Sequence, residues 1–217
     1  MPGADLRHVS TWLFDLDNTL YPLESGLGRD ISDRITTYVE RLTGLPRDEA
    51  RALQKRYLQE HGLTLKGLML HHDVDPDDFH AQFQDLSLAA LAANDALTRA
   101  IARLSGRRLI FTNADAGHAQ RVLARLELSQ LFDDVFHIAA ADFIPKPSPG
   151  AFERLAVAHA IEPAATCFFE DTARNLEPAA ALGMTTVLVG EAALGPAAPF
   201  VSHRALDLAQ FLASAQL

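Results

Sequence analysis

The chain has 217 residues, of which 48% are hydrophobic and 22% are charged, a balance typical of a globular protein rather than a disordered one. This length suffices for one α/β domain with an insertion or for two small domains. Nineteen Lys and Arg residues against twenty-eight Asp and Glu residues give a formal net charge of -9. Nucleic-acid polymers and anionic membranes select basic surfaces, so we expect neither as a partner. A small anionic substrate stays compatible with this charge, because a local cation can outweigh the global field.

A single cysteine, Cys167, excludes an internal disulfide. It lies in the apolar stretch TCFFED, where a free thiol usually packs as a small hydrophobic group. The first ten residues show no apolar secretory segment, and no stretch is long enough to span a bilayer, so we expect a cytoplasmic protein. The sequence leaves open whether this protein is a monomer or a homodimer.

The first predicted strand covers residues 11–14 of the stretch TWLFDLDNTLYP and is followed by two aspartates, Asp15 and Asp17. Two carboxylates this close repel each other unless a cation lies beside them. Either the strand simply ends in solvent, or the pair binds a metal ion and takes part in chemistry.

The next segment, up to about residue 94, carries helix signals and few strand signals. Apolar residues recur at helical spacing in RDISDRITTYVERL, and PRDEARALQKRYLQEHG has the start and stop signals of a helix. Asp75 before Pro76 predicts the start of a further helix. Because the segment is too long for a strand-to-helix loop, we expect a helical domain inserted after the first strand.

Four later apolar runs predict strands, and helical patterns lie between them. We expect these strands at residues 108–112, 135–138, 166–169 and 185–189, with helices at 119–128 and 149–159. Strands and helices in alternation indicate a parallel sheet covered by helices on both faces. We therefore predict an α/β fold, a Rossmann-like doubly wound parallel sheet with a small all-helical cap. The core domain would comprise residues 1–20 and 95–217, and the cap domain residues 21–94.

Polar groups of different kinds follow the predicted strands, and open α/β sheets bind ligands at the carboxyl ends of their strands. Besides the aspartate pair, these groups are Thr112 and Asn113, Lys146, and Glu170 with Asp171. Lysine is uncommon in this chain, with three lysines against sixteen arginines, which draws attention to Lys146. Turns, helix caps or solvent exposure would explain each signal alone. Their combination in this order indicates one site.

This set of groups suits phosphoryl transfer. Asp15 could attack phosphorus and form an aspartyl-phosphate. Asp17 could give a proton to the leaving oxygen and later take one from the attacking water. Mg²⁺ would take carboxylate oxygens from Asp15 and Asp171 and a backbone carbonyl near Asp17. Phosphate oxygens would be held by Thr112, the backbone N–H of Asn113 and the charge of Lys146.

The four stretches resemble the motifs of the haloacid dehalogenase superfamily of aspartate-nucleophile phosphatases. FDLDNTL is similar to the first motif, FTNAD to the second, PKPSPGAF to the third and FFEDTARNL to the fourth. The resemblance implies that Asp15 is the nucleophile, that Asp17 is the acid and base, and that Mg²⁺ is the cofactor. It also implies ligation of the metal by Asp15, the Asp17 carbonyl and Asp171, with Glu170 acting through water. The helical insertion resembles the small mobile cap of this superfamily.

Three stretches are similar to the pyrimidine 5'-nucleotidase branch, whose members act on UMP- or CMP-type nucleotides. They are LYP, HGLTLKGLMLHHDVDPDDFH and FTNADAGHAQRVLARLEL. The stretch FQDLSLAALAAND departs from that branch, which has a histidine and a Pro-Asp step there, so the base preference is open. Tyr21 at the mouth of the site and His71 in the cap are the expected substrate residues. The histidine pair His71 and His72 at a helix end is also compatible with a structural role.

Other functions remain open from these residues. A sugar-phosphate or phosphoglycolate phosphatase, or a phosphomutase, would use the same four motifs and differ only in the cap. A true dehalogenase needs neither the metal nor Asp17. A receiver domain carries its acceptor aspartate on a later strand and has no cap, and a non-catalytic regulatory protein would not need the complete set.

Overall fold

The computed structural model describes residues 3–196 and 198–217 and contains a six-stranded sheet in which every recorded pairing is parallel. The order of the strands is β3-β2-β1-β4-β5-β6. Their bounds are Thr11–Phe14 (β1), Arg107–Phe111 (β2), Asp134–Phe136 (β3), Thr166–Glu170 (β4), Thr185–Val189 (β5) and His203–Ala205 (β6). The predicted α/β fold class is confirmed, although β6 was not predicted and β2 and β3 begin one residue earlier than expected.

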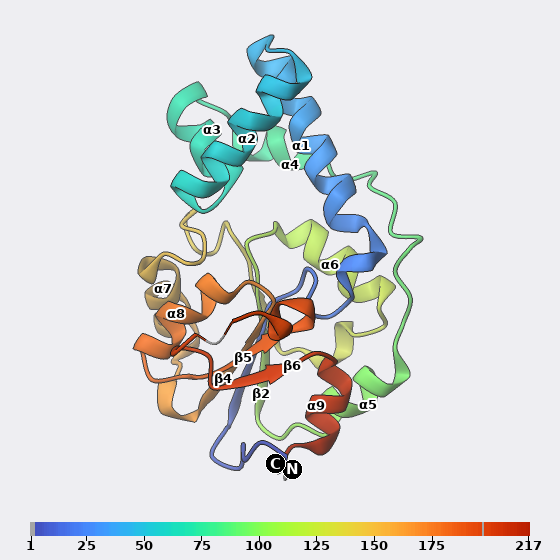
Figure 1. Cartoon of the computed structure of the whole chain (residues 1–217), viewed down its shortest axis with the longest axis vertical. Coiled ribbons are helices and arrows are strands. Elements are labelled where there is room, and N and C mark those ends of the chain that lie inside the picture. Colours follow the sequence, from blue (N-terminus) through green and yellow to red (C-terminus); the bar gives the residue numbers. More distant parts are fainter. Residues whose placement is uncertain (1–2, 197) are drawn as a thin grey trace.

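Both faces of this sheet are buried, which explains the uninterrupted apolar runs. Side chains alternate along a strand, so Trp12 and Phe14 pack in one apolar cluster and Leu13 in another. The first cluster includes residues of α5 (Asp95–Ala102), α6 (Ala116–Arg125) and α9 (Leu208–Ser214). The second includes residues of α7 (Pro149–His159) and α8 (Ala173–Ala181). The sheet is therefore doubly wound, with helices on either side (Figure 1).

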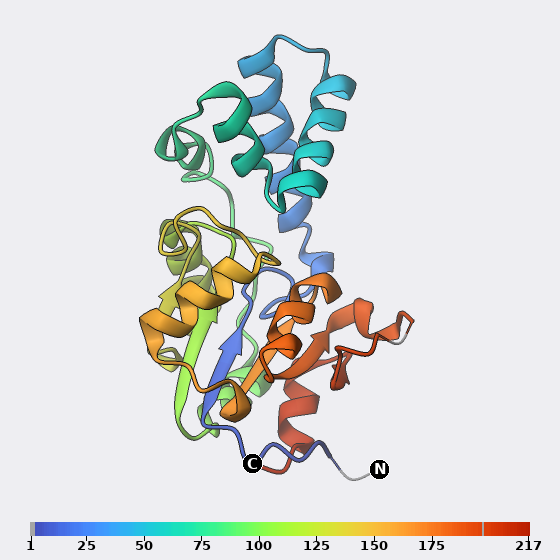
Figure 2. The same ribbon diagram turned by 90° about the vertical axis from the view of Figure 1, so that its left-hand side faces the viewer.

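Four helices between β1 and β2 form a group of their own beyond the ends toward which the strands run (Figure 2). They are α1 (Leu27–Thr43), α2 (Arg47–His61), α3 (Thr64–His72) and α4 (Pro76–Ala81). They share a separate apolar cluster that includes Tyr38, Leu53, Tyr57, Leu68 and Phe79. The first residue of α1, Leu27, and the segment after α4, through Leu86 and Leu91, pack with the core instead. The division into a core and a cap at residues 21 and 94 stays a prediction.

The ends of these helices follow the local sequence. The Asp75 carboxylate accepts a hydrogen bond from the Asp77 N–H at 2.8 Å and caps α4, as expected from Asp75 and Pro76. Gly62 ends α2 in the left-handed conformation that glycine adopts without strain. The sequence predicted a helix end at His71 and His72 but not the bounds of α3, because the stretch TLKGLMLHH has no clear apolar face and a central glycine. Its buried residues Leu65 and Leu68 hold it against α2.

Short 3-10 turns complete the chain at Leu23–Ser25, Ser129–Leu131, Pro163–Ala165 and Gly190–Leu194. Within the described ranges, no helix combines the length and apolar character required to cross a bilayer.

Gly67 provides a test of how closely α3 packs on α2. A Cβ at this position would lie 2.4 Å from Cγ of the buried Tyr57 ring. We expect Gly67→Ala to lower the free energy of unfolding by about 1–3 kcal/mol, the usual cost of overpacking. Gly150→Ala is the control, because its Cβ would meet atoms no closer than 3.6 Å. Urea unfolding measures both, and a Gly67→Ala protein as stable as the parent would contradict this packing.

Candidate active site

Strand β1 lies between β2 and β4, at the point where the strand order reverses direction. Ligands of open α/β sheets bind at such switch points, outside the carboxyl ends of the strands. The backbone N–H of Asp15 still donates to the Phe169 carbonyl at 2.9 Å, so the sheet pairing reaches the aspartate itself. Asp15 is therefore held by the sheet and is only 7% exposed.

The Lys146 ammonium is the centre of the polar contacts at this point. Nζ lies 2.7 Å from Asp15 Oδ1, 2.7 Å from Glu170 Oε2 and 2.7 Å from the Phe111 carbonyl oxygen. An ammonium has three N–H donors, and each has a partner here. The side chain is 1% exposed, so these three bonds replace water entirely.

The loop that carries Lys146 is fixed by Asn113. The Asn113 side-chain amide donates to the Lys146 carbonyl at 3.1 Å, and the Lys146 N–H donates to Asn113 Oδ1 at 2.8 Å. The Asn113 side chain therefore positions Lys146 through its backbone, while Asn113 also lines the cavity described below.

Burial and mutual repulsion raise the pKa values of the acidic groups around this lysine. Burial, reinforced by the nearby Glu170, raises the pKa of Asp15 to about 7, although Lys146 acts in the opposite direction. Burial likewise raises the pKa of Glu170 to about 7 against the influence of Lys146. The pKa of Asp171 is also raised, first by burial and then by Asp15.

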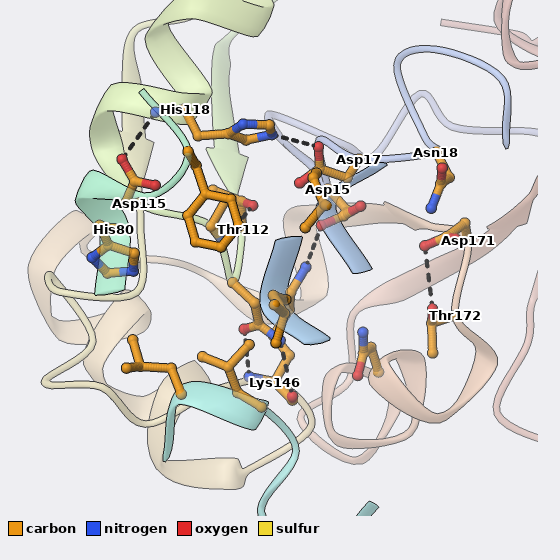
Figure 3. Close-up of a pocket in the computed structure, with 18 of the residues that line it drawn as sticks. Asp15, Asp17, Asn18, His80, Thr112, Asp115, His118, Lys146, Asp171 and Thr172 are labelled. Carbon is orange, nitrogen blue, oxygen red and sulfur yellow. Dashed lines mark hydrogen bonds and ion pairs between the residues drawn. The ribbon is translucent and has the colours of Figure 1, made fainter. Parts of the chain in front are cut away.

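Asp17 has a different environment from Asp15. Tyr21 donates its hydroxyl to Asp17 Oδ1 at 2.5 Å. His118 Nε2 lies 2.8 Å from the same oxygen (Figure 3). Burial raises the pKa of Asp17, but the hydrogen bonds and charge of these neighbours outweigh it and hold the pKa below its usual value. Burial lowers the pKa of His118, yet the hydrogen bond and charge of Asp17 prevail and raise it.

Three carboxyl groups beside the lysine fit a divalent cation. Oxygens of Asp15, Glu170 and Asp171 lie within 4.8 Å of one another. When ionised, these three carboxylates exceed the one ammonium by two charges, the charge of Mg²⁺, and hard oxygen ligands suit that ion. Each Glu170 oxygen already accepts a hydrogen bond, one from Lys146 and one from the Thr172 N–H. The action of Glu170 through water stays a prediction.

A cavity of about 290 Å³ opens onto these groups. Its polar side carries the carboxylates and Lys146, and Figure 3 shows their side chains gathered around it. Its opposite side is apolar and is lined by residues from the helices between β1 and β2 and from the segments beside them, among them Ile31, Ile35, Leu65, Phe79 and Phe83. Among the residues described, Lys146 is the one Lys or Arg side chain in this lining.

Most of the residues predicted from the sequence come together here. The cavity is lined by Asp15, Asp17, Thr112, Asn113, Lys146, Glu170 and Asp171. Tyr21 is not in this lining but contacts Asp17 directly. His71 lies elsewhere, exposed on α3, where its ring stacks on Tyr57 and its Nε2 is 3.3 Å from His61 Nε2. The roles of Tyr21 and His71 toward a substrate stay predictions.

Several polar residues of this site were given no catalytic or binding role from the sequence, among them Thr19, His118 and His80. Thr19 donates its hydroxyl to Asp15 Oδ2 at 3.3 Å, and the alternate spacing of residues 15, 17 and 19 was the available signal. His118 comes from α6 and is distant in sequence from Asp17, so only the fold brings the two together. His80 of α4 lines the cavity, and burial lowers its pKa and favours the neutral ring.

A family model for haloacid dehalogenase-like hydrolases matches residues 9–183, a range that contains all four strand-end stretches. The chain belongs to this family. The resemblance to the superfamily is thereby confirmed, and the protein is a hydrolase of the haloacid dehalogenase-like type.

This hydrolase is similar to Phosphate metabolism protein 8 of Saccharomyces cerevisiae, with 28% identity over 193 residues. The match covers 82% of this chain, and the chain spans 60% of the length of that relative. An HAD phosphatase from Thermococcus onnurineus superposes with a TM-score of 0.63 at 18% identity, over 96% of this chain and 100% of that one. The L-2-haloacid dehalogenase RSc1362 gives a TM-score of 0.60 at 19% identity, over 94% and 99% of the two chains. These structural likenesses show the shared fold.

The raised pKa values predict that a divalent cation competes with protons at this site. Protonated carboxyl groups do not bind Mg²⁺, and Asp15 and Glu170 have pKa values of about 7, so the affinity should fall as the pH falls. For each competing group we expect Mg²⁺ to bind about tenfold more weakly at pH 6 than at pH 8, with release of protons at the lower pH. Isothermal titration calorimetry in two buffers of different ionisation enthalpy measures both quantities.

Matched variants distinguish Mg²⁺ binding at this site from nonspecific attraction by the negative charge of the protein. Asp171→Asn should weaken Mg²⁺ binding, whereas Asp142→Asn, which removes an exposed carboxylate paired with Arg154, should not. Equal affinities at pH 6 and pH 8, or equal affinities in the two variants, would contradict a cation site at Asp15, Glu170 and Asp171.

Proposed function

We propose that this hydrolase is a Mg²⁺-dependent phosphomonoesterase that forms an aspartyl-phosphate on Asp15 and acts on pyrimidine nucleoside 5'-monophosphates. The observation that carries the proposal is the pair of aspartates after β1 with two different sets of partners. Asp15 contacts Lys146 and the acidic groups that fit a cation, whereas Asp17 contacts His118 and Tyr21. A nucleophile and a separate proton carrier are what phosphoester hydrolysis through an enzyme-bound phosphate requires.

The reaction would have two balanced steps. In the first, an Asp15 carboxylate oxygen forms a bond to phosphorus, the ester P–O bond breaks, and the leaving oxygen takes a proton from Asp17. In the second, water attacks the phosphorus of the aspartyl-phosphate and gives its proton to Asp17, and the Asp15 carboxylate is released. Asp17 thus acts first as an acid and then as a base.

Other groups of the site would hold the phosphoryl oxygens. The Thr112 hydroxyl accepts from the Ala114 N–H at 3.0 Å, which leaves its own proton available for a phosphate oxygen. Lys146 contributes positive charge beside Asp15. Asp15, Asp171 and the Asp17 carbonyl would bind Mg²⁺, with Glu170 acting through water. When bound, that ion neutralises charge that develops on the phosphoryl group.

The cavity supports a substrate with one phosphate and an uncharged, partly apolar leaving group. The phosphate would face the acidic groups and Lys146, and the leaving group would face Ile31, Ile35, Phe79 and Phe83. Aromatic and aliphatic side chains suit the faces of a nucleobase. No additional Lys or Arg among the described lining residues would recognise a carboxylate, which disfavours phosphoglycolate and 2-haloacids. The name of the yeast relative, Phosphate metabolism protein 8, supports phosphate chemistry.

Replacement of the nucleophile tests the covalent mechanism. We expect Asp15→Asn to lower phosphate release by more than about 10³-fold, since the amide is a poor nucleophile, while the protein stays folded. Rapid acid quench and mass spectrometry should find one phosphoryl group on Asp15 of the parent and none on the variant. Asp142→Asn is the control for loss of one carboxylate and should retain activity. A phosphorylated or active Asp15→Asn protein would show that another group is the nucleophile.

A substrate panel tests the specificity. UMP and CMP should have higher kcat/KM than hexose phosphates and phosphoglycolate, because only their leaving groups are both uncharged and partly apolar. Halide release from 2-chloropropionate should be absent. If hexose phosphates are hydrolysed as well as UMP and CMP, the nucleotidase function is wrong while the phosphatase function stands. Halide release without phosphatase activity would overturn both.

A further inference from the structure

We infer that His118 and Tyr21 are positioning residues that bind one oxygen of Asp17 and thereby reserve its other oxygen, Oδ2, for proton transfer. This inference rests on the proposed function. It adds that the two carboxylate oxygens of Asp17 have different roles.

The two donors come from independent parts of the chain. Tyr21 lies where the chain leaves β1 for α1, and it is 4% exposed. His118 lies in the first turn of α6 and is 5% exposed. Its backbone N–H donates to Asp115 Oδ1 at 2.9 Å, which caps the helix and fixes the point from which the imidazole extends. Figure 3 shows the His118 ring extending from α6 to Asp17.

Both donors bind the same atom. Tyr21 Oη lies 2.5 Å and His118 Nε2 lies 2.8 Å from Asp17 Oδ1. A carboxylate oxygen has about two lone-pair sites, so these two hydrogen bonds occupy Oδ1 fully. Within the described part of the chain, no group donates a hydrogen bond to Oδ2. With the proton of the imidazole on Nε2, His118 is a donor, and the proton of a protonated Asp17 is then on Oδ2.

This arrangement also keeps the carboxyl group from turning. Rotation that exchanged Oδ1 and Oδ2 would break two hydrogen bonds in a mostly buried site, where unpaired donors are costly. Oδ2 therefore stays the reactive oxygen through both steps. It gives its proton to the leaving oxygen as the ester P–O bond breaks, and it takes a proton from water as the bond between phosphorus and Asp15 breaks.

The dependence of the rate on the leaving group distinguishes this role from a structural one. A poor leaving group such as the alkoxide of a nucleoside needs a proton as it departs, whereas p-nitrophenolate departs without one. Loss of the Asp17 orientation should therefore slow phosphorylation of the enzyme by UMP far more than phosphorylation by p-nitrophenyl phosphate. A variant that is only less stable, or that binds phosphate less well, would slow both reactions equally.

The experiment measures the single-turnover rate of phosphoenzyme formation by rapid quench, with UMP and with p-nitrophenyl phosphate. The variants are Tyr21→Phe, which removes one hydroxyl, His118→Phe, and His118→Gln, whose amide N–H can replace the Nε2–H donor. Tyr38→Phe is the matched tyrosine control, since Tyr38 donates to Asp78 in the same way at 2.8 Å. His159→Phe is the histidine control, because His159 Nε2 lies 3.8 Å from Oδ2 of the exposed Asp134, away from the cavity.

We expect Tyr21→Phe and His118→Phe to slow phosphorylation by UMP about 10- to 100-fold and by p-nitrophenyl phosphate less than about threefold, as misplacement of a general acid would. Hydrolysis of the phosphoenzyme, which is the same species from either substrate, should slow by one common factor. His118→Gln should recover most of the rate with UMP, and both controls should match the parent.

Equal slowing with the two substrates, or no slowing with UMP, would overturn the inference. If His118→Phe does not fold, Tyr21→Phe and His118→Gln decide the question by the same comparison. Failure of the proposed function has a different signature, because the parent protein would then form no phosphoenzyme with either substrate.

Discussion

The buried ammonium of Lys146 is the interaction on which the geometry of the site depends. It donates to the Phe111 carbonyl at the end of β2, to Glu170 at the end of β4, and to Asp15 directly after β1. One side chain thus joins the carboxyl ends of three neighbouring strands. Burial of this charge would be strongly unfavourable without compensation, and the three hydrogen bonds with two carboxylates provide it. The same charge allows Asp15 and Glu170 to approach each other inside the protein.

This use of the lysine has consequences for what the cavity can bind. Lys146 is fully engaged within the protein, and no other Lys or Arg lines the described part of the cavity. The excess of carboxylates favours a divalent cation on one side, while Ile31 and Phe79 give the other side an apolar surface. In the proposed reaction, the carboxyl ends of the strands would therefore carry the groups that perform the chemistry, and the helices between β1 and β2 would contact the leaving group. Specificity can change in these helices while the chemistry stays the same.

Local signals predicted the central part of this fold well and its periphery less well. The strand at residues 11–14 and the helix that ends at Gly62 were predicted because apolar runs and capping residues are properties of neighbouring residues. The short strand β6 was missed because its residues, His203–Ala205, include two polar side chains and take their pairing from β5 alone. The contact of His118 with Asp17 could not be predicted, since it joins residues 101 positions apart in the sequence. The same limit applies to His71, which contacts Tyr57, and to His80, which lines the cavity.

The two aspartates of DLD show how neighbours, rather than residue type, decide a role. Burial and Glu170 raise the pKa of Asp15, whereas His118 and Tyr21 hold that of Asp17 below its usual value. Environments that shift the pKa values of two carboxyl groups in opposite directions are typical of sites in which the two groups have different chemical tasks. A dianionic phosphate beside Asp17 disfavours the carboxylate, because like charges repel, and so raises its pKa. In the proposed reaction, binding of the substrate would therefore bring Asp17 toward the protonated form that the first step requires. Departure of the product would reverse that change and return Asp17 to the carboxylate.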